Sequence, residues 1–287
     1  MYGKLGALYR GAVSSAYATL GLPLIRQWRA MQLRRLRPLA EGRPRGTPVV
    51  RHYWHQFLES HRADIRGRCL EIGTTDTVRT YGRDAVTSAD ALDLTRHSDE
   101  VTVLADLARA DEVPGGTYDC FINQFTMHLI YDVEAALYHS VRLLAPGGVL
   151  LMNFSCVDYC FPRGLDMGTG RPLFVFWGFT PIMVENMLRR ASLDDADFQI
   201  IVRGNLFARV AYQMNMPSEE LSRAELETDD PGHPVLVCVR VVKPAGWAGA
   251  RPEYRDPWLP DVTPDRWSPD RGHYSGLGLT KPFDRHQ

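Results

Sequence analysis

The sequence predicts an α/β fold with a doubly wound, mostly parallel sheet. Short apolar runs alternate with segments of helical periodicity from residue 68 to residue 203, as in strands joined by crossover helices. The first run ends in Glu71-Ile72-Gly73 and then turns, which is typical of a strand that leads to a ligand site in such a sheet. Strands are expected at 68–72, 85–89, 101–104, 118–122, 148–154, 198–203 and 234–242.

The helices are indicated by apolar spacing and by end signals. Val133–Leu144 carries apolar residues three and four positions apart, which predicts a face turned to the core. Pro181–Ala191 follows Thr180, a predicted N-cap, and has proline at its first position, where a missing N–H is tolerated. A helix over His52–His61 leads into the first strand, and residues 5–40 also have helical spacing.

Composition divides the chain into three parts. Residues 1–48 form a predicted N-terminal helical arm that ends in a linker rich in glycine and proline, and we expect this arm to act as a lid or a dimer contact. Residues 49–244 hold the alternating strands and helices. Residues 245–287 are rich in proline, glycine and tryptophan, and their aromatic residues favour a tail wrapped over the domain rather than a disordered one.

Charge and hydropathy narrow the functional classes. The 287 residues have a formal net charge of −1, so nothing global indicates binding to nucleic acid. Residues 1–51 are basic, with Glu41 as their one acid, which suits a solvated helix face, or contact with an anionic substrate or a membrane surface. Gly11–Ile25 is too short and too polar for an export signal or a stable membrane insertion. A cytoplasmic protein is therefore expected.

The five cysteines fit the same location. Cys69, Cys120 and Cys238 lie in apolar runs, where a thiol behaves as a small hydrophobe, and an odd number does not suit a disulfide framework. The spacing of Cys156 and Cys160 is compatible with a redox pair or a metal pair, but no second Cys or His pair at zinc-like spacing accompanies them. No metal site is expected.

Polar residues follow the first four predicted strands. They are Glu71, Gly73, Thr74, Asp90, Asp106, Asn123 and Gln124. Because parallel strands place their carboxyl ends at one edge of a sheet, these residues are expected to gather around one ligand. Each acid taken alone also suits a solvated strand end or a helix cap.

In chain order, these segments resemble the class I S-adenosylmethionine (SAM) dependent methyltransferases over residues 51–243. The resemblance is closest to a type 11-like branch often associated with glycosyltransferases and natural-product pathways, and the segments that carry it include Tyr81-Gly82, Ala105-Asp106-Leu107, His128–Asp132 and Gly178–Pro181. It implies a Rossmann-like sheet whose last two strands form an antiparallel hairpin, a SAM-dependent methyltransferase domain over residues 49–244, and SAM as the cofactor.

The resemblance also assigns roles at the strand ends. Asp90 is expected to accept hydrogen bonds from the ribose hydroxyls, with Asp93 as the second choice. Asp106 would accept from the adenine amine, and Leu107 would pack on the ring. The amino-acid end of SAM would lie among Glu71, Gly73, Thr74, Asn123 and Gln124. The family commonly has a glycine-rich turn after the first strand, and here only Gly73 of that pattern is present.

Transfer to a hydroxyl needs alignment of the acceptor and a nearby base. His128, just after the fourth strand, is the first candidate, although a histidine there also suits a structural role. His52 and His55, in the helix before the first strand, are the alternatives.

The resulting hypothesis is a methyltransferase that acts on oxygen, less readily on nitrogen, of a sugar-containing or secondary-metabolite acceptor. The alternative is a SAM-fold protein without methyl transfer, such as a repurposed enzyme or a binding or scaffold subunit. A nicotinamide oxidoreductase is a third option, which the missing G-x-G-x-x-G pattern disfavours. A small-molecule acceptor, and possible pairing as a homodimer, are the expected partners.

Overall fold

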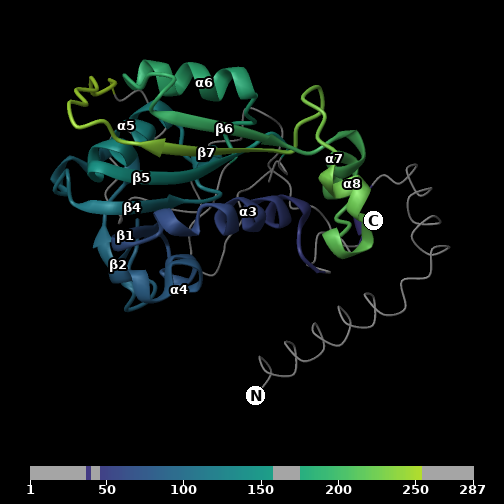
Figure 1. Ribbon diagram of the computed structural model, residues 1–287, viewed down its shortest axis with the longest axis horizontal. Coiled ribbons are helices and arrows are strands. Elements are labelled where there is room, and N and C mark those ends of the chain that lie inside the picture. The colour runs from purple at the N-terminus through teal and green to yellow at the C-terminus, as the bar shows by residue number, and fades with distance from the viewer. Residues whose placement is uncertain (1–36, 40–45, 158–174, 254–287) are drawn as a thin grey trace, which may run out of the picture.

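The computed structural model describes residues 37–39, 46–157 and 175–253, which fold around one seven-stranded sheet (Figure 1). The strand order is β3-β2-β1-β4-β5-β7-β6. Neighbouring strands from β3 to β5 are parallel, whereas β7 is antiparallel to both β5 and β6. The strands are β1 Gly67–Ile72, β2 Val86–Asp93, β3 Val101–Leu104, β4 Tyr118–Asn123, β5 Leu144–Ser155, β6 Phe198–Arg203 and β7 Leu236–Val242. The mostly parallel sheet and its antiparallel C-terminal pair are confirmed.

Helices cover both faces of this sheet. In Figure 1, α5 and α6 lie above it, and α3 and α4 lie below it. The described helices are α3 Val49–Ser60, α4 Asp76–Gly82, α5 Val133–Leu143, α6 Pro181–Arg190, α7 Leu206–Gln213 and α8 Arg223–Glu227, with short 3₁₀ turns at η2 Arg62–Asp64, η3 Arg83–Ala85, η4 Leu107–Glu112, η5 Met127–Leu129 and η6 Ser218–Glu220.

Each face of the sheet buries its own apolar layer. Side chains alternate along a strand, so in β1 Leu70 packs in the layer under α5 and α6, while Cys69 packs in the layer against α3. Trp54 and Tyr53 of α3 are among the largest fully buried side chains. Burial on both faces explains why the central strands read as continuous apolar runs in the sequence.

The helices predicted at 52–61, 133–144 and 181–191 are present with small shifts at their ends. The helix before β1 begins at Val49, just after Pro48, and so includes three residues more than expected at its start. Helix α6 begins at Pro181 as predicted, and the Thr180 hydroxyl accepts a hydrogen bond from the Met183 amide at 3.3 Å. Strand β5 begins at Leu144 rather than at 148, because Gly147 adopts a φ of 77° that lets the chain pass through an irregular step and continue.

The region between β1 and β3 differs most from expectation. Strand β2 continues past 89 to Asp93, and residues 94–100 then connect it to β3 without a helix. A short connection suffices because β3 pairs only with the last three residues of β2, Ala91 to Asp93, so the chain has little length to retrace. The connection therefore stays close to the carboxyl edge of the sheet.

Little of the two predicted terminal regions is described. Most of the N-terminal arm and residues 254–287 lie outside the described residues. The start of the C-terminal region does pack on the domain, because the Trp247 indole donates to the Ala191 carbonyl at 2.8 Å and its ring lies 5.1 Å from the Lys243 ammonium. None of the described helices is long and apolar enough to cross a membrane.

Candidate functional site

The strand order reverses between β1 and β4, and this reversal locates the candidate site. The chain moves from β1 outward to β2 and β3, then crosses back to β4 on the other side of β1. The loops after β1 and β4 therefore leave in opposite directions, and doubly wound folds bind ligands outside the carboxyl ends of the two strands at such a point. Gly73 and Gln124 are the first residues beyond these strands.

A buried hydrogen-bonded chain crosses this point. Glu71, fully buried, accepts from the Val78 amide at 3.0 Å and from the Gln124 side chain at 2.8 Å. The Trp54 indole donates to the Gln124 oxygen at 2.7 Å, and the Gln124 amide also reaches the Thr77 hydroxyl at 2.8 Å. Burial raises the pKa of Glu71 to about 7. Glu71 and Gln124 thus meet as predicted, but their polar atoms join α3, α4 and β4 to one another.

The turn after β1 passes close to the end of β2. Gly73 has a φ of 76°, and its amide donates to the Leu92 carbonyl at 2.9 Å. A Cβ at Gly73 would touch the Asp93 carboxylate at 3.5 Å, an ordinary contact distance. The turn therefore brings the backbone of Gly73 and the Asp93 carboxylate next to each other at the carboxyl edge.

The 94–100 connection folds back onto the same turn. His97 Nε2 lies 3.0 Å from the Gly73 carbonyl oxygen, to which it donates in the Nε2–H tautomer. The Glu100 carboxylate accepts from the Thr74 hydroxyl at 3.3 Å and from the Thr75 amide at 3.4 Å. Thr74, predicted to contact the ligand directly, is therefore also a contact of this connection.

Asp90 does not lie where the sequence argument put it. It sits inside β2 opposite Leu70, and its carboxylate accepts from the Arg68 guanidinium at 3.0 Å and from the Thr102 hydroxyl at 2.8 Å. Asp93, the second choice, is the acid at the end of β2 beside Gly73. Cross-strand partners let an acid stay in mid-strand, so Asp90 did not mark the strand end.

Asp93 is half-buried and only partly engaged by the protein. One carboxylate oxygen accepts from the Thr95 amide at 3.0 Å, and the other lies 3.7 Å from His97 Nδ1. Leu94 and Leu104, next to it in the chain and across the strand pair, are 50% and 51% exposed. An acid between two exposed leucines offers both hydrogen bonding and apolar contact.

The two residues predicted to contact adenine after β3 differ in their surroundings. Asp106 caps η4 by accepting from the Ala108 amide at 2.9 Å, directly beyond β3. Leu107 is 3% exposed and packs in the core, so it offers little surface for a ligand ring. The apolar contact predicted for Leu107 is better provided by the exposed leucines beside Asp93. Leu94 could have been found as the apolar residue that directly follows the acid.

Asn123 at the end of β4 and Phe125 just beyond it lie in different surroundings. Asn123 is fully buried beneath the edge, where its amide donates to the Ser140 hydroxyl at 3.3 Å. Phe125, in contrast, leaves the strand with a φ of 49°, and its amide donates to the Asn153 side chain at 2.9 Å. Asn123 therefore supports the edge from below and does not line it, while Phe125 reaches it.

The three candidate bases lie on two elements. His128 is half-buried on η5, and its carbonyl accepts from the Phe176 amide at 2.8 Å. His52 and His55 lie on α3, where desolvation and then Arg203 lower the pKa of His52, and desolvation and then Arg51 lower the pKa of His55. Both α3 histidines are therefore neutral at pH 7 and able to accept a proton.

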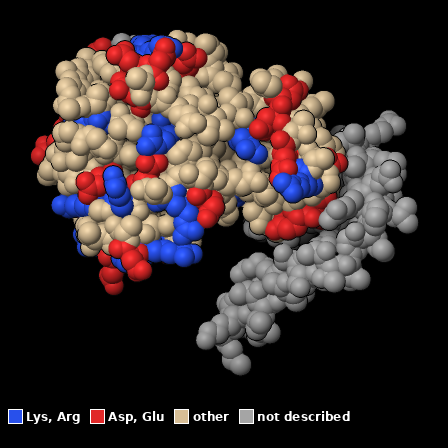
Figure 2. All heavy atoms as spheres, in the orientation of Figure 1, with Lys and Arg blue, Asp and Glu red and all other residues tan. Residues whose placement is uncertain are grey.

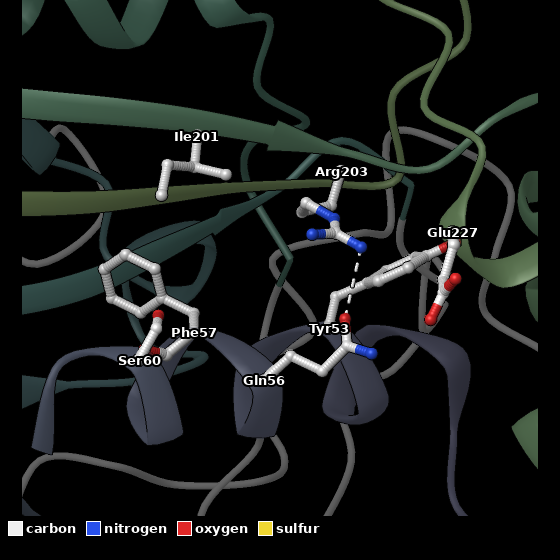
Figure 3. Close-up of a pocket in the computed structure, with 7 residues that line it drawn as sticks. All are labelled: Tyr53, Gln56, Phe57, Ser60, Ile201, Arg203 and Glu227. Carbon is white, nitrogen blue, oxygen red and sulfur yellow. Dashed lines mark hydrogen bonds between the residues drawn. The ribbon is translucent and has the colours of Figure 1, made fainter.

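A cavity of about 380 Å³ lies elsewhere, between α3 and the edge strand β6 (Figure 3). Several of its polar groups are paired: the Arg203 guanidinium donates to Gln56 at 3.1 Å and lies 5.2 Å from the Tyr53 ring, and Glu227 pairs with Arg223. The Tyr53 hydroxyl is buried without a hydrogen-bond partner among the described residues. The cavity follows the side of α3 that faces β6, whereas Trp54 faces Gln124 at the switch point. It is separate from the site at the carboxyl edge.

Charge on the visible face is mixed. Figure 2 shows basic and acidic side chains interspersed over the sheet domain, and acidic side chains gathered around α7 and α8. No group of three or more His, Cys, Asp or Glu is arranged to hold a metal ion in the described part of the chain.

Comparison with known proteins yields structural neighbours only. No family model and no curated protein matches the sequence. The structure is similar to YcgJ of Bacillus subtilis, with 14% identity, coverage of 68% of this chain and 100% of that one, and a TM-score of 0.43. It is similar to the [4+2]-cyclase SpnF, with 16% identity, coverage of 82% and 96%, and a TM-score of 0.45. A third neighbour is phosphoethanolamine N-methyltransferase 2 of Haemonchus contortus in complex with SAM, with 14% identity, coverage of 67% and 53%, and a TM-score of 0.43.

These scores all lie below 0.5, so the assignment of the fold depends on strand order and direction. A seven-stranded sheet of order β3-β2-β1-β4-β5-β7-β6 with β7 antiparallel has the architecture that the sequence resemblance implied. The chain has the fold of the class I SAM-dependent methyltransferases.

Proposed function

We propose that this protein is a SAM-dependent methyltransferase that acts on a small-molecule acceptor. The observation that carries the proposal is the position of the Asp93 carboxylate directly beside the Gly73 turn at the carboxyl edge of β1 and β2. SAM is the cofactor that accompanies this fold, and when bound it supplies a methyl group on a positively charged sulfur, which is already electrophilic. The protein then has to bind, orient and deprotonate the acceptor.

The residues around the turn after β1 suit the adenosine part of SAM. Asp93 would accept hydrogen bonds from the two ribose hydroxyls, because a carboxylate is a strong double acceptor. Asp106, which caps η4, would accept from the adenine amine. Leu94 and Leu104 would cover the ring with apolar surface that is otherwise exposed to water. Gly73 lets the backbone approach the ligand because no Cβ stands in the way.

The acceptor side comprises the residues beyond β4. His128 would take the proton of an acceptor hydroxyl, and its place on η5, four residues after Gln124, supports this role. Phe125 and Trp54, whose ring centroids are 6.4 Å apart, would offer aromatic surface to the acceptor. We assign transfer to oxygen of a sugar-containing or secondary-metabolite acceptor from the resemblance of the sequence to methyltransferases of such pathways.

The proposed location is the cytoplasm. Cys69, Cys120, Cys156 and Cys238 are free thiols, and three of them are buried. Free thiols suit a reducing compartment.

The proposal is tested by binding and transfer together. Calorimetric titration of the full chain with S-adenosylhomocysteine (SAH) should give micromolar binding, and incubation with methyl-labelled SAM and an extract of small metabolites should give labelled small molecules. Binding without any transfer would favour the alternative of a SAM-fold protein that does not methylate. Binding of a nicotinamide dinucleotide in place of SAH would reject the proposal.

A further inference from the structure

A basic and aromatic surface borders the switch point on the side of α3. Arg51, in the first turn of α3, places its guanidinium 4.7 Å from the centre of the Phe125 ring. Phe125 follows the carboxyl end of β4, next to β1 in the sheet. His55 lies one helical turn after Arg51, and Tyr212 of α7 is close enough to influence Arg51 electrostatically. We call Arg51, His55, Phe125 and Tyr212 the α3 mouth.

Arg51 differs from the other well-placed arginines in having no acid partner. Arg68 pairs with Asp90 at 3.0 Å, and Arg240 pairs with Asp64 at 2.8 Å. In the described part of the chain, Arg51 is exposed and has no carboxylate within ion-pair distance, and its contact is the Phe125 ring. The guanidinium is therefore held against the Phe125 ring, and no described carboxylate neutralises its charge.

Among the described residues, no carboxylate acts electrostatically on Arg51 or on His55. His55 is neutral at pH 7, because burial and then Arg51 lower its pKa. Glu219 and Glu227 act on His52 instead. An anion bound at the α3 mouth would therefore meet the charge of Arg51 without repulsion from a neighbouring carboxylate.

An arginine that lies over an aromatic ring is well suited to binding an oxyanion. The cation–π contact holds the guanidinium beside Phe125 without using its N–H groups as donors to an acid. Those groups match a carboxylate or a phosphate in a two-point hydrogen bond. Phe125 and Tyr212 supply aromatic surface beside that position.

We propose that the α3 mouth binds an anionic group, a carboxylate or a phosphate, carried by the acceptor, and that Arg51 is the residue that selects it. The inference rests on the proposed methyl transfer only in that the anionic group belongs to the methyl acceptor. Anion binding at Arg51 is a property that can be measured whether or not SAM binds.

The experiment compares three small probes of similar shape on the full chain. Benzoate carries a carboxylate, phenyl phosphate carries a phosphate, and benzamide is the neutral control. Dissociation constants are measured by ligand-observed NMR with SAH present and again without it, for the parent, Arg51→Gln, Arg51→Lys and the control Arg66→Gln. Arg66 is an exposed arginine at the opposite end of β1, and its replacement removes the same charge.

At least one anionic probe should bind the parent about tenfold or more tightly than benzamide, and Arg51→Gln should remove that preference, as expected for loss of a charged hydrogen-bonding partner. Arg51→Lys should keep part of it, and Arg66→Gln all of it. The tighter of benzoate and phenyl phosphate identifies the anion. Equal binding of all three probes, no anion binding at millimolar concentration, or unchanged anion binding in Arg51→Gln would overturn the inference. Failure of SAH to bind while Arg51-dependent anion binding persists would instead count against the methyltransferase proposal alone.

Discussion

The two halves of the carboxyl edge differ in charge. The half formed by β1, β2 and β3 ends in acids, with Asp93 beside Gly73 and Asp106 beyond β3. The half formed by α3, β4 and α7 carries Arg51 and His55 next to aromatic rings. A carboxylate is the right group for sugar hydroxyls and a guanidinium is the right group for an oxyanion. The contrast suggests that cofactor and acceptor are distinguished by opposite charges on the two sides of the switch point.

The buried chain from Trp54 through Gln124 to Glu71 joins these two halves. It runs from α3 on the acceptor side to α4 on the cofactor side, with every link between 2.7 and 3.0 Å. Changes on one side can therefore alter the position of groups on the other. Each prediction below separates the two halves or tests the connection between them.

The largest effect is expected on the acceptor side. If His128 accepts the hydroxyl proton, His128→Ala should lower the turnover number by about a hundredfold or more, since general-base contributions fall in the range of about 10² to 10⁴. The affinity for SAH should change less than about twofold, because the residue lies beyond β4. Turnover is measured with saturating SAM, and SAH affinity by calorimetry. A parallel loss of both would assign His128 a structural role in the site wall, and His55 would then be tested in the same way.

The next effect distinguishes two acids on one strand. Asp93→Ala should weaken SAH binding by about tenfold to a hundredfold, the range for loss of hydrogen bonds to a charged acceptor. Asp90→Ala is the matched control and should leave the dissociation constant within about twofold, because its carboxylate is paired with Arg68 and Thr102 inside β2. The reverse result, in which only Asp90→Ala weakens SAH binding, would place the ribose at Asp90, as the sequence analysis predicted.

This pair also shows how far the sequence could predict the site. The apolar runs located every strand, because burial on both faces leaves a clear pattern. The end of β2 was not predictable, since the polar Asp90 interrupts the run and its partners on β1 and β3 are distant in sequence. Leu107 was misassigned for a related reason: only the packing of η4 shows that it turns into the core.

The acceptor side was predicted least well. The helix before β1 was predicted, but which of its side chains face the switch point depends on helix rotation relative to β4. Trp54 turns toward Gln124, while Tyr53 turns toward Arg203. Arg51 stood in the sequence as the last residue of a basic stretch, and no local signal distinguished it from the others. Its position over Phe125 arises from tertiary packing alone.

A smaller effect tests the connection between the halves. Trp54→Phe keeps an aromatic ring but removes the indole N–H that satisfies Gln124. The free energy of unfolding should fall by about 1–3 kcal/mol, the cost of leaving a buried acceptor unpaired, with some further loss from the smaller ring. Chemical denaturation measures this change. Phe57→Leu, a change in the same helix that removes no hydrogen bond, serves as the packing control. If both variants lose the same free energy of unfolding and both bind SAH as tightly as the parent, the indole hydrogen bond has no special role.

The smallest effect is a pH dependence that arises from Glu71. Burial raises its pKa from the usual 4.5 to about 7, so the folded state binds a proton more tightly than the unfolded state. The contribution of Glu71 to the free energy of unfolding is therefore greatest below pH 4.5 and is lost as the pH rises toward 7. Between pH 5 and pH 7 the parent should lose about 1–2 kcal/mol more of its free energy of unfolding than Glu71→Gln, which cannot ionise. An identical pH slope in parent and variant would indicate that Glu71 ionises normally.

The central claim is that the edge between Gly73 and Asp93 holds the adenosine part of SAM. Its most direct measurement is a calorimetric titration of the full chain with SAH, repeated with NAD under the same conditions. We predict one SAH bound per chain with a dissociation constant in the micromolar range, and no measurable heat with NAD. No heat with SAH, or a preference for NAD, would contradict the claim.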